Sequence, residues 1–475
     1  MDLDRSSVVL YGSRVGISLV GFLSTVYFAR ELGAAGLGLY FTFETVVNVL
    51  GVFARFGADN AVIKRMSESD SDRERGRFLT AALLAVVLPF VLVSLGLVGF
   101  RDTVGALFNS GIGVGLVPLL VVVIGIESAG WVLASALRGE RRIATSAGVE
   151  VCGEVARVGL SVALVLGGGG AVALVYGLLV GQFVRAVAAA GLVRTPLLRP
   201  TRETFGRLVS FSKYTAGMNV SHLAYSWFDT LALAVFVSSA AVGVYEAAWR
   251  VSVVVMLASS SIGAALAPSV SNWHANGEIE RIEAAVSESL TYALLLVVPA
   301  VVGVAILGGA FMRNLYRFDT GGFVLLLLVA EKLFQAVKDI VQSTLLGTER
   351  QRLVFWTNTV AVGANIVLNV LLVPRYGLVG AAVATTSTAG TAALAQTAAL
   401  DRAIAVRFDV RAITWQAVAA AAMGVAVYVT SRAIPPTTTP RLLVLVALGV
   451  VVYGGAVLGH EDTRTRLVGL VPSVG

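Results

Sequence analysis

Apolar segments of about 20 residues recur along the whole chain and are separated by short polar or charged loops. An α-helix of that length crosses the roughly 30 Å of hydrocarbon in a bilayer and satisfies its backbone polar groups within the segment. The pattern therefore predicts an all-α integral membrane protein with about fourteen transmembrane helices. Their expected ranges are 8–30, 37–57, 78–100, 113–137, 145–166, 170–193, 208–237, 241–268, 286–308, 322–346, 353–373, 378–400, 411–432 and 441–459.

The apolar pattern contains an internal repeat, in which Gly38 and Tyr40 correspond to Gly243 and Tyr245, some 205–210 residues later. An even number of spans in each copy gives both copies the same orientation about an axis along the membrane normal. Tandem membrane units of this kind are typical of carriers that move two lobes around a central substrate site. We therefore expect an N-terminal six-helix lobe at 1–193, a cytoplasmic linker at 194–207, a C-terminal six-helix lobe at 208–400, and two additional transmembrane helices with a short cytoplasmic tail at 401–475.

The composition indicates that the bilayer is the main solvent, because 57% of the residues are hydrophobic, 14% are charged and the mean hydropathy is +0.83. The single cysteine, Cys152, cannot form an intramolecular disulfide, and three scattered histidines have no metal-ligand spacing. The glycines at 167–170 lack the Lys-Ser/Thr that follows a phosphate-binding loop. The sequence thus predicts no cofactor and no metal, and it does not support an ATP-driven pump.

The net charge of +7 is distributed unevenly between alternate loops. The loops on the side of the N-terminus contain 21 Lys and Arg residues, and the loops on the opposite side contain seven. The positive-inside rule then predicts a multi-pass protein of the cell membrane with both termini in the cytoplasm. Because the cations alternate with membrane spans and do not form one basic face, we expect no nucleic-acid partner.

Eight Lys and Arg residues remain inside the predicted spans, where an unpaired cation costs at least about 2.5–3.5 kcal/mol. Arg55 and Arg185 lie close to cytoplasmic helix ends, so we expect their side chains to reach the interface. Arg157 follows Glu154 by less than one turn, which leaves a structural ion pair and a functional role both open. The cations least able to reach water are Arg14, Arg250 and Lys332. We expect these three to face a cavity between the lobes and to attract an anionic substrate.

Acidic residues inside the spans are candidates for ion pairs or for ion coupling. Asp229 and Arg250 are expected at similar depth on consecutive helices, since each residue advances a helix by about 1.5 Å. This pair would either hold a helical hairpin together or act as a gate or coupling site. The other candidates are Glu127, Glu331, Lys338 and Asp339. Carboxylates in such positions can balance charge or carry a coupling ion, Na⁺ or H⁺.

Motifs in both halves resemble one known family. They are FARELGAAGLGLY at 28–40, FGADNAVIKR at 56–65, the stretch from Asp229 to Arg250, and the stretch from Leu346 to Ala382. These resemble the polysaccharide-biosynthesis (O-antigen type) flippases of the multidrug/oligosaccharidyl-lipid/polysaccharide exporter superfamily. The resemblance implies two six-helix lobes around a central V-shaped cavity. It also implies that the cargo is a polyprenyl- or dolichyl-(pyro)phosphate-linked saccharide, moved from the inner to the outer leaflet without covalent chemistry.

Two other functions compete with this interpretation. A cation-coupled multidrug exporter of the same superfamily commonly lacks the last two helices, and a cationic drug would be repelled by a cavity lined with cations. A membrane glycan polymerase or ligase is expected to carry a large external loop, whereas the longest external loops here, near 101–112 and 309–321, are short. The preferred interpretation is a non-enzymatic flippase whose partners are a lipid-linked saccharide, membrane lipids and glycan assembly proteins.

The topology can be tested with reporter fusions. A reporter fused after Arg466 should behave as cytoplasmic, and one inserted within 309–321 should behave as external, because the cations favour that orientation. Labelling of the C-terminal tail from outside intact cells would contradict the orientation and the lobe assignment that depends on it.

Overall fold

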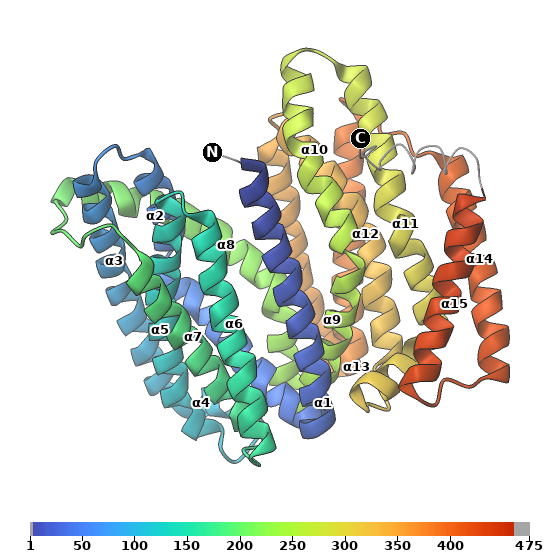
Figure 1. Cartoon of the computed structure of the whole chain (residues 1–475), viewed down its shortest axis with the longest axis horizontal. Coiled ribbons are helices and arrows are strands. Elements are labelled where there is room, and N and C mark those ends of the chain that lie inside the picture. The colour runs from blue at the N-terminus through green and yellow to red at the C-terminus, as the bar shows by residue number, and fades with distance from the viewer. Residues whose placement is uncertain (1–2, 460–475) are drawn as a thin grey trace. The chain divides into compact units, whose positions relative to one another are not determined.

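The computed structural model describes residues 3–459, and it describes their side chains except at 3–15, 213–214, 216–225, 257–258, 260–261 and 264–265. Every regular element in this range is helical, which confirms the predicted all-α class (Figure 1). In chain order these are α1 (Leu3–Arg55), α2 (Ala58–Glu68), α3 (Asp72–Gly99), α4 (Arg101–Ala106), α5 (Gly113–Gly139), α6 (Ile143–Leu166), α7 (Val172–Leu192), α8 (Arg202–Phe236), α9 (Ser239–Val255), α10 (Leu257–Ala275), α11 (Ile279–Phe311), the π-helical turn η1 (Met312–Tyr316), α12 (Gly322–Gly347), α13 (Gln351–Asp401), α14 (Val410–Ala433) and α15 (Thr439–Leu458).

Four of the expected helices lie in pairs under one label, and a fifth is divided. The pairs 8–30 with 37–57 and 353–373 with 378–400 are included in α1 and α13, and the two helices of each pair meet at a glycine whose backbone is not helical, as the sequence predicts. These glycines are Gly33 and Gly377, where φ is 67° and 56°, and glycine adopts this left-handed conformation without steric cost. Conversely, the expected single span 241–268 is divided at Met256 into α9 and α10.

Eight helices of the described residues are long and apolar enough to cross a membrane, judged by length and composition. The labels α1 and α13 each count once in this number, although each joins two helices, and α13 has 51 residues where one crossing needs about 20. The helices thus support a multi-pass membrane protein, and the figure of about fourteen crossings stays a prediction.

The chain divides into two compact units, Met1–Gly243 and Val244–Gly475. In the first unit α5, α6 and α7 pack on one another, and α1 lies against α6 and α8. In the second unit α12 is central and contacts α10, α11 and α13. The division into six-helix lobes at 1–193 and 208–400 stays a prediction.

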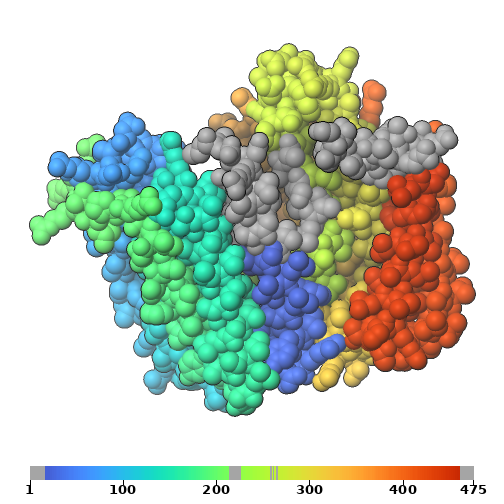
Figure 2. All heavy atoms as spheres, viewed as in Figure 1, coloured from blue at the N-terminus to red at the C-terminus, as the bar shows by residue number. Residues whose placement is uncertain are grey.

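The last two helices form one outer wall of the second unit (red in Figure 2). α14 and α15 pack on each other and on α11 through a core of buried side chains that includes Leu307, Met423 and Leu442. Their outward side chains are also apolar, since Val425 is 65% and Val450 66% exposed. An apolar residue on both faces is typical of a helix that packs on protein on one side and faces lipid on the other.

The predicted linker is attached to the first unit by Glu140, the residue that follows α5. Its carboxylate accepts hydrogen bonds from the backbone N–H of Arg194 at 2.9 Å and from the N–H and hydroxyl of Thr195 at 2.8 and 2.7 Å. Burial raises the pKa of Glu140, but these bonds and one from Arg142 outweigh that effect, so the pKa lies below its usual value. The attachment therefore stays charged and intact throughout the neutral range and is lost only on strong acidification.

The glycines of the internal repeat meet each other in the first unit, where the start of α9 crosses α1. A Cβ atom on Gly38 would lie 1.6 Å from the carbonyl oxygen of Ser239 and 2.9 Å from the backbone N of Gly243. A Cβ atom on Gly243 would lie 2.1 Å from the carbonyl oxygen of Ala34 and 3.0 Å from the backbone N of Gly38. The two backbones are in contact at this crossing, so only glycine fits there.

Alanine at Gly38 should destabilise the fold by about 1–3 kcal/mol or more, because the added methyl group overlaps the backbone of α9. Gly159→Ala on α6 is the matched control, since a Cβ atom there meets nothing within 4 Å and alanine favours a helix. Thermal unfolding of the purified variants measures the difference. Equal melting temperatures would show that the crossing accommodates a side chain.

Candidate functional site

The three predicted cavity cations lie on different helices. Arg14 belongs to α1, and its side chain is outside the described residues. Arg250 on α9 is half-buried and its Nε atom is inaccessible to solvent. Lys332 on α12 is 5% exposed. The predicted partner of Arg250, Asp229 on α8, is buried in the first unit. That the three cations face one cavity stays a prediction. The pair between Asp229 and Arg250 also stays a prediction.

Lys332 is held by its neighbours on α12. Its Nζ lies 2.7 Å from Oε2 of Glu331 and donates a hydrogen bond of 2.9 Å to Oε1 of Gln335. The side chains of Lys332 and Glu331 are 6% and 1% exposed, so the structure brings two predicted site residues together as a buried ion pair. Lys338 and Asp339 follow two turns later on the same helix, and a second pair of opposite charges is therefore adjacent in the sequence.

Glu127 on α5, a predicted candidate for an ion pair or ion coupling, forms a buried ion pair with Arg55, a partner that the sequence did not indicate. Its Oε1 lies 2.8 Å from Nη1 of Arg55 and accepts a second hydrogen bond of 3.1 Å from Nε1 of Trp131. The side chains of Arg55 and Glu127 are 10% and 3% exposed. The expectation that Arg55 reaches the membrane interface is wrong, because the carboxylate of Glu127 offsets its charge inside the unit.

Three arginines surround the ring of Trp131. The guanidinium carbons of Arg185, Arg55 and Arg138 lie 4.5, 5.7 and 5.8 Å from the ring centroid. A cation is attracted to the face of an aromatic ring at such distances, and the attraction is stronger away from water. The expectation that Arg185 extends to the interface is therefore also wrong, since its guanidinium stacks on Trp131.

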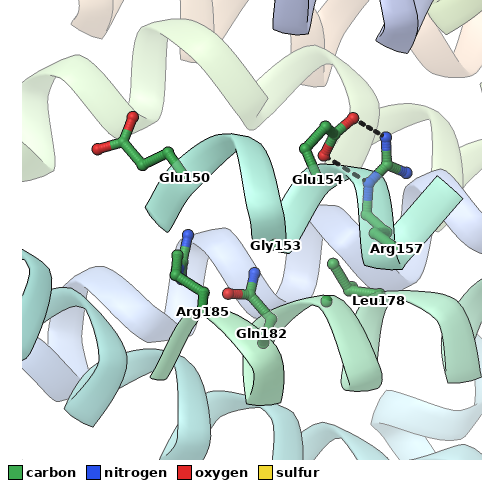
Figure 3. A pocket seen from close by; sticks show the side chains of 8 residues that line it. Glu150, Gly153, Glu154, Arg157, Leu178, Gln182 and Arg185 are labelled. Atoms are coloured by element: carbon green, nitrogen blue, oxygen red, sulfur yellow. Dashed lines mark hydrogen bonds and ion pairs between the residues drawn. The ribbon is translucent and has the colours of Figure 1, made fainter. Parts of the chain in front are cut away.

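A small polar cavity of about 60 Å³ lies between α6 and α7 (Figure 3). It is lined by Glu150, Gly153, Glu154, Arg157, Leu178, Gly181, Gln182 and Arg185. The two helices approach closely because a Cβ atom on Gly181 would lie 2.6 Å from Cβ of Arg157 and 2.8 Å from the carbonyl oxygen of Gly153. Small residues thus bring the charged side chains of both helices around one space.

Both carboxylates of this cavity are paired with arginines. Glu150 binds Arg138 at the end of α5. Glu154 accepts a hydrogen bond of 2.8 Å from Nε of Arg157, so the ion pair between them is present, while its structural or functional role stays open. Nη1 of Arg157 also donates to the hydroxyl of Tyr40 at 2.8 Å, and that hydroxyl donates to Glu44 at 3.2 Å. The charges on α6 are therefore compatible with a helix inside the bilayer.

Sequence reasoning identified Glu127 and missed the residues around it. Trp131 and Arg138 follow Glu127 at spacings of four and eleven residues, which places all three on one face of α5. That periodicity could have predicted that these three residues lie close together. The partners on α1 and α7 depend on how the helices pack, and no local pattern in those helices indicates it.

The arrangement in the first unit suits the binding of a charged group more than covalent chemistry. Arginines and carboxylates line the cavity between α6 and α7, and a tryptophan lies beside it. Among the residues that the structure describes, no group of three His, Cys, Asp or Glu side chains could hold a metal. Buried charges inside a membrane protein are costly and usually belong to a substrate or ion pathway.

Comparisons with known proteins point to one family. The family model described as a polysaccharide biosynthesis protein matches residues 27–317. Two relatives come from Haloferax volcanii. Agl15, named as a probable low-salt glycan biosynthesis flippase, is 29% identical over 99% of this chain and 100% of its own length. AglR, named as a probable flippase, is 28% identical over 98% of each chain.

Two solved structures show the same fold. The lipid II flippase MurJ, in an inward closed conformation, has a TM-score of 0.79 at 16% identity and covers 97% of this chain and 100% of its own. An inward-facing multidrug transporter of the MATE family has a TM-score of 0.62 at 16% identity and covers 81% of this chain and 96% of its own. This chain therefore shares its helical fold with both structures.

Replacing Arg55 with alanine should destabilise the protein by about 3–5 kcal/mol, because the carboxylate of Glu127 then remains buried without its cation. The double variant Arg55→Leu with Glu127→Leu should recover most of this loss, since it removes both charges. Lys64→Ala is the control, because that lysine is 46% exposed and its pair with Glu68 contributes at most about 1 kcal/mol. Unfolding of purified variants gives the three values. A loss at Arg55 no larger than at Lys64 would contradict the pair.

Proposed function

Because this chain belongs to the polysaccharide biosynthesis protein family, as the resemblance of its motifs indicated, we propose that it is a flippase for a lipid-linked saccharide. Its cargo would be a saccharide on a polyprenyl- or dolichyl-(pyro)phosphate, moved from the inner to the outer leaflet of the cell membrane. Two relatives that align with nearly the whole chain are named as probable flippases, which supports this proposal. The process requires no covalent step, so the protein would act without being an enzyme.

The observation that carries the proposal is the set of cations kept inside apolar helices. A lipid phosphate that crosses the bilayer loses its hydration and needs compensating positive charge. Arginine supplies this charge with two parallel hydrogen bonds, which matches the geometry of a phosphate group. We assign this role to Arg14, Arg250 and Lys332, of which Lys332 also pairs with Glu331.

A coupling ion, Na⁺ or H⁺, would act through the buried acidic residues of α12. Glu331 neutralises Lys332, so a proton on Glu331 would release the lysine charge for an anionic cargo. Lys338 and Asp339 are part of the same proposal. Protonation of Glu331 would thereby couple an ion gradient to the affinity of the protein for the phosphate of its cargo.

The multidrug exporter is the weaker alternative. The MATE structure corresponds to 81% of this chain, whereas the MurJ structure corresponds to 97%. The partners that we propose are a lipid-linked saccharide, the surrounding lipids and glycan assembly proteins. We also propose that both termini lie in the cytoplasm.

Transport of lipid-linked glycan to the outer leaflet should fall more than tenfold in Arg250→Ala, because the phosphate then lacks its cation. Arg250→Lys should retain part of the activity, since the charge remains but the planar fork does not. Arg441→Ala is the control, as this arginine is exposed at the start of α15. Surface glycan in cells that depend on this protein, together with its amount in the membrane, gives the readout.

Two results would argue against this role of Arg250. Normal transport by the alanine variant would exclude a contact with substrate. Restoration of transport by adding Asp229→Ala would identify the two residues as a structural pair, because removing both charges corrects a buried imbalance.

A further inference from the structure

Arg185 is the lining arginine of the α6–α7 cavity that no carboxylate neutralises. Its Nε and Nη2 atoms are buried and have no hydrogen-bond acceptor among the described residues. No carboxylate oxygen of the described chain lies within ion-pair distance of it, and its guanidinium rests on the ring of Trp131. A buried charged donor without an acceptor costs more than an ordinary lost hydrogen bond, so this position calls for a missing partner.

The neighbouring acidic residues are occupied by other arginines. The pairs are Arg138 with Glu150, Arg157 with Glu154, and Arg55 with Glu127. Arg55 also lies 3.8 Å from Asp59, so four carboxylates are engaged in this cluster. None of these ion pairs includes Arg185, and its N–H groups therefore still call for an acceptor.

The volume limits how much of that partner can lie inside the cavity. The cavity measures about 60 Å³, and by this measure a water molecule needs about 10–15 Å³, so it holds only a few small groups. The cavity is partly open, so a larger ligand could place only its charged end inside. Figure 3 shows Arg185 and Gln182 extending from α7 toward α6, where Gly153 faces α7.

We propose that the cavity between α6 and α7 binds a small monovalent anion, such as chloride, against the guanidinium of Arg185. Gln182 completes the site. Its Oε1 is buried and receives no hydrogen bond in the described structure. The two ends of a glutamine amide have nearly the same shape, so a half-turn of the amide would direct its N–H groups at the anion. Nothing in this site depends on the transported cargo, so it stands apart from the proposed transport function.

The first test compares salts at equal ionic strength on the full-length protein in lipid nanodiscs. Sodium chloride and sodium bromide should raise the melting temperature by roughly 2–5 °C above sodium gluconate, with saturation, because a ligand that binds the folded state stabilises it. Arg185→Gln should lose this increment. Arg73→Gln, at an exposed arginine of α3, should keep it.

Three outcomes of this test would overturn the site. They are equal melting temperatures in chloride and gluconate, an undiminished increment in Arg185→Gln, and stabilisation by sodium phosphate but not by chloride. The last result would mean that the arginine binds oxyanions, whether free phosphate or a lipid headgroup.

A second variant places the missing charge in the protein itself. Gln182→Glu puts a carboxylate into the cavity beside Arg185 and should make the anion unnecessary. Its melting temperature in gluconate should match that of the unmodified protein in chloride, and chloride should add nothing. A full chloride increment in Gln182→Glu would contradict the proposal.

Bromide also allows the anion to be located directly by crystallography, without the need for a variant that folds. In crystals of the unmodified protein grown with bromide, an anomalous peak should lie within contact distance of the guanidinium of Arg185. Electron density at that place without an anomalous signal would show that the cavity holds water, and it would overturn the proposed anion site.

Discussion

Burying charge in a helical unit surrounded by lipid is the constraint on which the first unit depends. An arginine there is tolerated when a carboxylate or an aromatic ring from another helix offsets it. Glu127 joins α5 to α1 through Arg55, and Glu150 joins α6 to α5 through Arg138. Each pair is thus also a contact between helices. Removing one partner would both expose a buried charge and separate two helices.

The sequence predicts the helical fold well because the length of each apolar segment matches the thickness of the bilayer that the helix crosses. Ranges such as 113–137 and 411–432 coincide with α5 and α14 to within a few residues. The expected breaks after residues 30 and 373 coincide with Gly33 and Gly377, whose backbones are not helical. A glycine between apolar runs is typical of such a break, because it adopts a positive φ without steric cost.

The candidate site was predicted less completely, and the reason is geometric. Lys332 and Glu331 are neighbours in the sequence, so their pairing is a local property that helix geometry makes available. The cluster around Trp131 draws on α1, α5 and α7, and its members are far apart in the chain. Arg185 therefore resembled any arginine near a helix end. Only the packing of α7 against α5 distinguishes it.

The contact between Gly38 and Gly243 has a consequence for which changes the chain tolerates. These two residues occupy equivalent places in the predicted repeat, and each approaches the backbone N of the other. Reciprocal contact between equivalent residues is the arrangement found on the axis of a two-fold homodimer. Here both residues belong to one polypeptide, so a side chain at either glycine meets the backbone of the other helix, and a change at one position cannot be compensated at the other.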